Sequence, residues 1–123
     1  EIETDWVGTL ADNSVCLTDF GAKATADGTA EAVEKAKKGL EDGTIHVFDT
    51  STFTVTVTKD KNVNAKVDAD GHLTSYMADV DTDANYTPDT EAVSDGYFHE
   101  SEYRAAPYFD IQIDGIELLD TAF

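Results

Sequence analysis

The chain has 123 residues, the length of one ordinary domain and enough to bury a hydrophobic core. Its 26 Asp and Glu residues against 8 Lys and Arg residues give a formal net charge of −18, so its surface repels nucleic acids and anionic lipids and attracts cations. Hydrophobic residues make up 41% of the chain, which is too many for an acidic disordered tail. We therefore predict one folded domain over residues 1–123 that neither binds nucleic acid nor inserts into a membrane, since no apolar run is long enough to span one.

Two short apolar runs, at 5–10 and 15–18, flank the polar turn sequence at 11–14 and predict a β-hairpin. Trp6 lies in the first run. Packing at the edge of the core is the first interpretation of this side chain, and stacking on a ligand ring is the second. Cys16 lies in the second run as a small, half-buried residue. A single cysteine cannot form an internal disulfide, so the cysteine content fits both a reducing and an extracellular setting.

The clearest local pattern is an amphipathic helix that begins at Thr29 and ends before Gly43. Val33, Ala36 and Leu40 form one apolar stripe, and Glu and Lys residues cover the opposite side. The Thr29 hydroxyl is a suitable N-cap, and Gly43 stands where a left-handed residue ends a helix.

Strands are predicted to follow the helix. Residues 44–48 are rich in β-branched and apolar side chains, and residues 53–58 alternate apolar residues with threonines, the period of a half-buried strand. Residues 63–67 and 72–76 continue this alternation on either side of the Asp-Gly turn at 70–71. We expect an α+β fold in which one main amphipathic helix packs on a mostly antiparallel sheet with β-hairpins.

Residues 79–95 predict an acidic loop. Asp79, Asp81 and Asp83 alternate as at the start of a calcium-binding loop, where oxygen ligands converge from alternate residues. The match then fails, because Ala84 replaces the glycine of the sharp bend and the twelfth position lacks the bidentate glutamate. A solvated acidic loop is the first interpretation, and a calcium site through these three aspartates is the alternative; we expect no other metal and no cofactor.

The end of the chain predicts a second hairpin. Phe109, Ile111 and Ile113 alternate with polar residues in a strand at 108–113, the Asp-Gly pair at 114–115 is a strong two-residue turn signal, and apolar residues resume at Ile116 and Leu118.

No pattern in the sequence predicts catalysis. The histidines, His46, His72 and His99, lie in separate predicted elements with none at a metal-ligand spacing from another, and His46 falls on the solvent side of its strand. The sequence contains no P-loop, no dinucleotide-binding glycine motif and no nucleophile elbow. We predict that the protein is not an enzyme. A small hydrolase that uses two of the many carboxylates is a third function class, and it would need a carboxyl with a raised pKa in an enclosed pocket.

Two segments of the sequence carry a resemblance to a known family. Residues 47–51 read Val-Phe-Asp-Thr-Ser and follow the predicted helix, and residues 97–104 read Tyr-Phe-His-Glu-Ser-Glu-Tyr-Arg. Together with the Trp-x-Gly sequence at 6–8, they resemble the C-terminal part of the basic membrane protein (BMP) class of ABC-transporter substrate-binding lipoproteins. This class has a type I periplasmic-binding-protein fold, and the likeness spans most of the chain.

The resemblance implies that the chain is the C-terminal portion of a two-lobed solute-binding protein. Such a protein delivers a small solute, in several members a purine nucleoside, to an ABC permease. It is extracellular and is held to the membrane by a lipidated cysteine upstream of this chain; Cys16 is not that cysteine, because no small-residue lipobox precedes it. A part cut from a two-lobed protein exposes apolar surface, so we expect a homodimer or rearranged edge strands in isolation.

The composition also supports an alternative of a different class. A free-standing acidic extracellular module could bind a cation such as calcium, or a protein partner, through the aspartate-rich loop.

Overall fold

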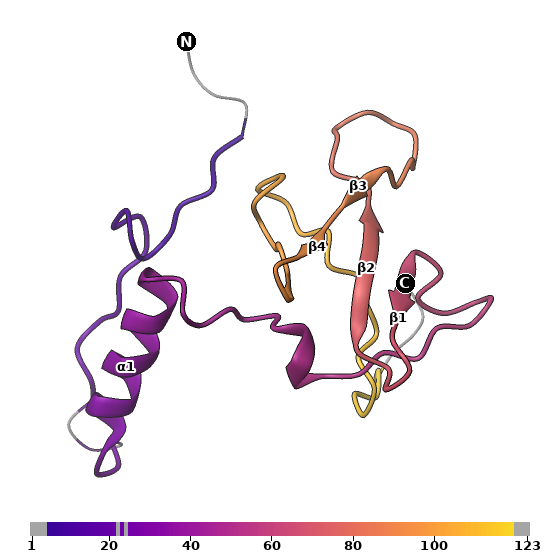
Figure 1. Ribbon diagram of the computed structural model, residues 1–123. Coiled ribbons are helices and arrows are strands. Elements are labelled where there is room, and N and C mark those ends of the chain that lie inside the picture. Colours follow the sequence, from indigo (N-terminus) through magenta and orange to yellow (C-terminus); the bar gives the residue numbers. More distant parts are fainter. Residues whose placement is uncertain (1–4, 22, 24, 120–123) are drawn as a thin grey trace. The chain divides into compact units, whose positions relative to one another are not determined.

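The computed structural model describes residues 5–21, 23 and 25–119. The chain forms two compact units, Glu1–Val47 and Phe48–Phe123. The first unit contains the α-helix and the second contains the strands (Figure 1). The α+β class is thereby confirmed. The packing of the helix on a sheet and the single-domain organisation stay predictions.

The helix α1 spans Thr29–Glu41, as the apolar stripe predicts. Gly28 is the N-cap, with φ 82°, and no side chain caps this end. The predicted cap at Thr29 is wrong, because Thr29 is already the first helical residue and glycine supplies the left-handed entry instead. At the other end Gly43 has φ 73°, so the predicted left-handed C-terminal residue is confirmed.

The chain folds back sharply after α1. The amide of Thr44 donates to the carbonyl of Gly39 over 2.9 Å, the bond of a Schellman motif, and Ile45 donates to the same carbonyl over 3.0 Å. Gly39 is buried, and a Cβ atom there would collide with the side chain of Ile45. A glycine inside the helix therefore makes room for the turn. Of the predicted stripe, Val33 is half-buried and Leu40 is exposed.

The turn at 11–14 forms, but its flanking segments are not strands. The amide of Ser14 donates to the carbonyl of Thr9 over 3.1 Å, and Asp12 Oδ1 accepts from the amides of both residues. The predicted hairpin is wrong in its strands, because a two-stranded ribbon without a third strand is only marginally stable in water.

The strands predicted at 44–48 and 53–58 are also absent. Between them lies the 3-10 helix η1, Thr50–Thr52, whose N-cap Asp49 accepts from the amide of Ser51 over 2.9 Å. Val47 is 67% exposed, contrary to the buried position that a strand would give it. The polar break predicted at 49–52 is confirmed as a tight helical turn.

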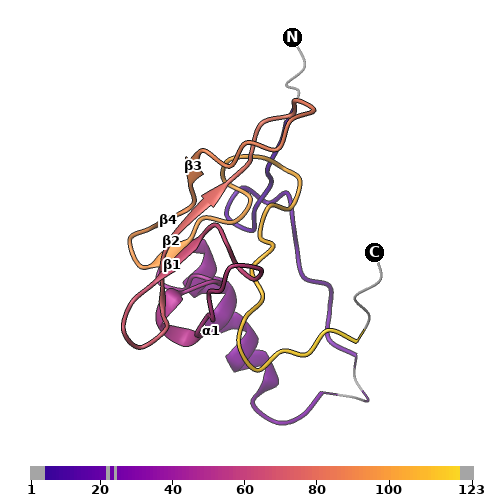
Figure 2. The same cartoon turned by 90° about the vertical axis from the view of Figure 1, so that its right-hand side faces the viewer.

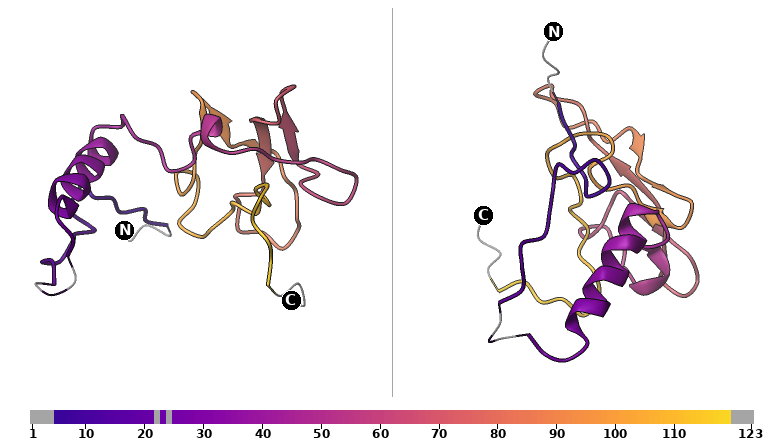
Figure 3. Two further views of the ribbon diagram at one scale, coloured as in Figure 1. Left: turned by 90° about the horizontal axis from the view of Figure 1, so that it is seen from below. Right: turned by 90° about the vertical axis from the view of Figure 1, so that its left-hand side faces the viewer.

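Two small antiparallel sheets organise the second unit. The first has the order β1-β2-β3 and the second pairs β4 with β5, and β1 lies beside β2 as Figures 2 and 3 show. Their bounds are Ala65–Val67 for β1, Leu73–Ala78 for β2, Thr90–Glu91 for β3, Val93–Ser94 for β4 and Tyr97–Phe98 for β5. The strands predicted around the turn at 70–71 are confirmed, and Gly71 has the positive φ, 88°, that this turn needs.

The core of the second unit is built around Phe98, which is 2% exposed. Its ring meets those of Phe48 and Phe109 edge to face at centroid distances of 6.4 and 4.8 Å, and these two rings stack at 4.1 Å. Such contacts add to the energy of burial. The buried hydrophobic residues of this unit are Val55, Ala65, Leu73, Tyr76, Ala78, Ala92, Phe98, Tyr108 and Ile111.

The predicted C-terminal hairpin keeps its turn but not its strands. Gly115 has φ 84°, and the amide of Ile116 donates to the carbonyl of Ile113 over 3.4 Å. No strand is assigned over 108–119, and Ile116 and Leu118 are exposed, so the predicted apolar face there is wrong.

Two polar side chains explain why no ladder forms. Asn62 Nδ2 donates to the carbonyls of Thr56 and Gln112 over 2.9 and 3.0 Å, and Asn62 Oδ1 accepts from the amide of Gln112 over 2.9 Å. The Asp114 carboxylate likewise accepts from the amide of Thr56 and the hydroxyl of Thr54, both over 3.0 Å. The extended segments at 53–58 and 111–114 are thus joined largely through side chains in place of a backbone ladder.

Candidate functional site

The predicted ligand-stacking residue, Trp6, lies in the first unit and is 67% exposed. Core packing of this side chain is therefore wrong, and stacking on a ligand stays a prediction. Cys16 is a free, exposed thiol where a half-buried residue was predicted. His46, predicted on the solvent side of a strand, is half-buried in a segment that is not a strand.

The three aspartates of the predicted calcium loop all accept hydrogen bonds from the loop itself. Asp79 Oδ2 accepts from the amide of Thr87 over 2.8 Å. Asp81 Oδ1 accepts from the amide of Asp83 over 2.9 Å, and Asp83 Oδ1 accepts from the amide of Asn85 over 2.6 Å. These carboxylates fold the connection between β2 and β3. Calcium binding by them stays a prediction.

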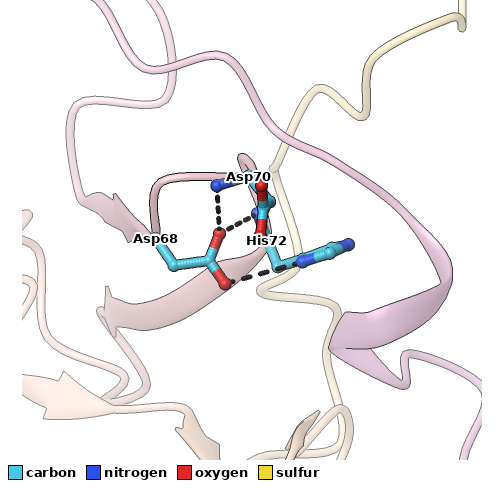
Figure 4. A group of neighbouring side chains, drawn as sticks. All are labelled: Asp68, Asp70 and His72. Atoms are coloured by element: carbon cyan, nitrogen blue, oxygen red, sulfur yellow. Dashed lines mark hydrogen bonds and ion pairs between the residues drawn. The ribbon is translucent and has the colours of Figure 1, made fainter.

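A different trio lies at the turn between β1 and β2. Among the described residues, one ligand atom from each of Asp68, Asp70 and His72 lies within 4.8 Å of the others (Figure 4). Carboxylate oxygens with an imidazole nitrogen suit divalent transition metals. Sequence reasoning missed the trio because it compared histidines only with one another; the alternate spacing Asp-x-Asp-x-His across a tight turn was the available signal.

The turn itself accounts for this trio. Asp68 Oδ1 accepts from the amides of Asp70 and His72, each over 2.9 Å, and Asp68 Oδ2 lies 3.5 Å from His72 Nδ1. The hydrogen bond from the His72 amide lowers the pKa of Asp68; desolvation raises it, and the hydrogen bond from the Asp70 amide, with the neighbouring His72 side chain, adds to the lowering, so the pKa lies below its ordinary value. The carboxylate of Asp68 is therefore a turn-forming acceptor, whether or not a cation binds beside it.

The second unit also contains a chain of serine, histidine and glutamate. His99 is buried; its Nε2 lies 2.7 Å from Ser94 Oγ, and its Nδ1 lies 2.7 Å from Glu102 Oε2. These are the distances of a nucleophile, a general base and an orienting acid. The Tyr108 hydroxyl donates to the carbonyl of His99 and fixes the same segment.

Two features of this chain of side chains favour a structural role. Asp95 Oδ2 lies 3.4 Å from Ser94 Oγ, so a negative charge stands beside the hydroxyl that would have to lose its proton to act as a nucleophile. The bonds of His99 also tie the β4–β5 hairpin to the turn that follows it. The prediction that the protein is not an enzyme stays a prediction.

Four cavities are notable in the described chain. The first unit has one of about 260 Å³ between residues 10–20 and α1. The second unit has an apolar groove of about 470 Å³ that includes Phe48, Phe109 and Leu118, and two polar hollows beside Tyr76 of about 230 and 140 Å³. Ser94 lines none of these four.

Within the described ranges, no helix is both long enough and apolar enough to cross a membrane, and α1 has only 13 residues. In comparisons with known proteins, no family model, curated protein or solved structure matches the chain.

Proposed function

We propose that the chain is the C-terminal region of an extracellular solute-binding protein of the BMP class, which delivers a small solute to an ABC importer. The starting point is the resemblance carried by residues 47–51 and 97–104. In the full-length protein, the solute would bind between two lobes, with a nucleoside as the first candidate, and a lipid anchor upstream would hold the protein at the membrane.

One structural observation supports this proposal: the two segments that carry the resemblance pair with each other. The amide of Phe98 donates to the carbonyl of Phe48 over 3.0 Å. The amide and hydroxyl of Thr50 donate to the carbonyl of Gly96 over 2.9 and 3.0 Å, at the turn that opens the second segment. Asp49 forms an isolated antiparallel bridge with Tyr97.

This pairing gives both segments a shared physical role. If the two segments resembled the family only by chance, nothing would require them to lie in contact in the fold. Segments that build one core together are expected to occur in the same protein. Phe48 and Phe98 are packed in that core, so their role is to hold the second unit together. We therefore place solute contacts outside the two segments.

The proposal is tested with the full polypeptide that the gene encodes, including any residues before Glu1. Its melting temperature is measured with a panel of nucleosides, sugars and amino acids, and with calcium. A solute at a hundred times its Kd stabilises the folded state by about 2.7 kcal/mol, so we expect one class of small solute to raise the melting temperature clearly.

The opposite outcomes are equally specific. A gene that encodes neither an upstream lobe nor a lipobox would overturn the proposal, and so would a full polypeptide that no solute stabilises. Stabilisation by calcium alone would favour the free-standing acidic module instead. Replacement of Trp6 by Ala in the full polypeptide tests the predicted ligand contact, and a weaker solute response is expected.

A further inference from the structure

A hollow lined by tyrosines and aspartates lies beside β2 in the second unit. Its volume is about 230 Å³. We call it the tyrosine pocket; the lining residues used here are Tyr76, Asp79, Tyr86, Arg104, Tyr108 and Asp110. The neighbouring hollow of about 140 Å³ shares Tyr76, Tyr86 and Asp110 with it. Aromatic and acidic side chains thus converge on one small space.

Two of the aromatic walls are fixed by the core. Tyr76 is 2% exposed, and its ring centroid lies 5.5 Å from that of Phe98. Tyr108 is also buried, with its ring centroid 5.7 Å from that of Phe98. These two side chains form a rigid floor of the pocket, and most of their ring surface is covered by the core.

The third wall stands on the loop between β2 and β3. Tyr86 is 67% exposed, and its hydroxyl accepts a hydrogen bond of 2.6 Å from Asn64 Nδ2. The loop is folded by Asp79, which accepts from the amide of Thr87 over 2.8 Å. Tyr86 therefore presents an aromatic surface to solvent at the side of the pocket and is held there by one contact.

Each carboxylate of the pocket accepts one hydrogen bond, and Asp79 is half-buried whereas Asp110 is exposed. Asp110 Oδ1 accepts from the Tyr76 hydroxyl, and Asp79 Oδ2 accepts from Thr87. No other hydrogen bond or ion pair of either carboxylate occurs within the described part of the chain. Burial, and then the hydrogen bond to Asp110, raise the pKa of Tyr76 well above its usual range, so this hydroxyl remains a donor at neutral pH.

The charges of the pocket favour a monovalent cation. The lining contains two carboxylates, of Asp79 and Asp110, and one guanidinium, that of Arg104, whose Nη1 donates to the carbonyl of Asp81 over 3.3 Å. The pocket therefore has one excess negative charge, within a chain whose formal net charge is −18. An anion would be repelled, and such a field concentrates cations.

We propose that the tyrosine pocket binds a small organic ammonium ion. The exposed face of Tyr86 attracts a poorly hydrated ammonium through its quadrupole, and the carboxylate of Asp110, which lines the same pocket, adds a charge of the opposite sign. A metal ion is a poorer match, because two carboxylates give it few oxygen ligands and the aromatic faces give it none. The pocket lies wholly within the second unit, and its test uses choline alone, so the result can be read separately from the panel of solutes that tests the proposed function.

Isothermal titration calorimetry with choline tests the proposal. The matched probe is 3,3-dimethyl-1-butanol, which has the shape of choline without its charge. We expect choline to bind at least about tenfold more tightly than the alcohol, the size of a partly desolvated cation–π contact. Equal affinities, or no binding of choline at millimolar concentration, would overturn the proposal.

Four variants locate the site. Tyr86→Ala and Asp110→Asn should each weaken choline binding by about tenfold, whereas Tyr86→Phe, which keeps the ring but loses the hydrogen bond with Asn64, should weaken binding less than Tyr86→Ala does. Asp70→Asn removes the same charge from the exposed β1–β2 turn and should leave the affinity unchanged. Circular dichroism verifies that each variant is folded. If Asp70→Asn weakens binding as much as Asp110→Asn does, choline is attracted only by the general charge and the proposal is wrong.

Discussion

The amide of Phe98 donates to the carbonyl of Phe48 over 3.0 Å, and the two aromatic rings meet edge to face in the same core. Phe48 is the first residue of the second unit and Phe98 lies in β5, so this contact closes the second unit around its aromatic centre.

Truncation of Phe98 should therefore be strongly destabilising. We expect Phe98→Ala to lower the free energy of unfolding of the second unit by about 3–5 kcal/mol, because it removes a fully buried ring and leaves a cavity. Urea denaturation followed by tyrosine fluorescence measures the change. The control Val63→Ala, at an exposed position, should lie within about 0.5 kcal/mol of the wild type. A loss below about 1 kcal/mol for Phe98→Ala would show that this core is not formed.

Asn62 should be sensitive to an isosteric change. The Asn62 amide nitrogen donates to the carbonyls of Thr56 and Gln112. Asn62→Asp replaces this nitrogen with a negatively charged oxygen, which the two carbonyl oxygens repel. We expect a loss of about 1–3 kcal/mol in the free energy of unfolding, measured by urea denaturation. Asn85→Asp introduces the same charge on the exposed acidic loop and serves as the control. Equal stabilities of the two variants would contradict the bridging role of Asn62.

Glu91 should make stability depend on acid pH. Partial burial raises the pKa of Glu91, but hydrogen bonds from Ser75, Tyr76 and Val93 outweigh that effect and leave the pKa below its ordinary value of 4.5. The ionised carboxylate therefore contributes stability above the pKa of the unfolded chain, and this contribution disappears as the pH falls through the lower folded value.

The variant Glu91→Gln isolates this contribution. At neutral pH we expect it to cost about 1 kcal/mol, since the carboxylate is largely solvated. The stability difference from the wild type should shrink as the pH is lowered below 4.5. Urea denaturation at a series of pH values measures both quantities, and a difference that stays constant down to low pH would be inconsistent with a depressed pKa.

Gly43 tests the end of α1. Gly43→Ala places a Cβ at φ 73°, which costs about 1–2 kcal/mol, and should shorten or weaken the helix. Gly43→Asn should lose less, because asparagine tolerates this conformation. Gly21→Ala, where a Cβ meets nothing within 4 Å, is the matched control. Far-UV circular dichroism on heating compares the variants, and identical melting of all of them would exclude the left-handed cap.

Ser94 should be unreactive despite its hydrogen bond to His99. The Asp95 carboxylate, 3.4 Å from Ser94 Oγ, disfavours loss of the serine proton, which a nucleophilic attack requires. We expect no labelling by a fluorophosphonate probe and no ester hydrolysis above the buffer rate. Labelling of the wild type that disappears in Ser94→Ala would refute the structural role and identify a nucleophile.

The sequence predicts those elements that local interactions determine. The helix α1 follows from its apolar stripe, and Gly43 and Gly71 end the helix and the turn because the backbone there needs a positive φ. β1 and β2 follow from alternation around that turn. The Asp-Gly turn at 114–115 is local in the same sense.

The missing strands depend on partners that no local pattern specifies. Residues 53–58 alternate as a strand should, yet in the fold Thr56 bonds to the side chains of Asn62 and Asp114. Asn62 lies outside the alternating segment and Asp114 is far away in the sequence, so the alternation does not reveal either partner. For the same reason, the meeting of Tyr86 with Asp110 at one pocket could not be predicted, since it depends on how a loop returns to β2.

The pairing of residues 48–50 with residues 96–98 is tested most directly by hydrogen exchange at single amides. The amides of Thr50 and Phe98, which donate across this pairing, should be among the slowest to exchange and should open together with the global unfolding of the second unit. Exchange of both at the rate of an unfolded chain, while the amides of β2 remain protected, would show that the two segments are not joined.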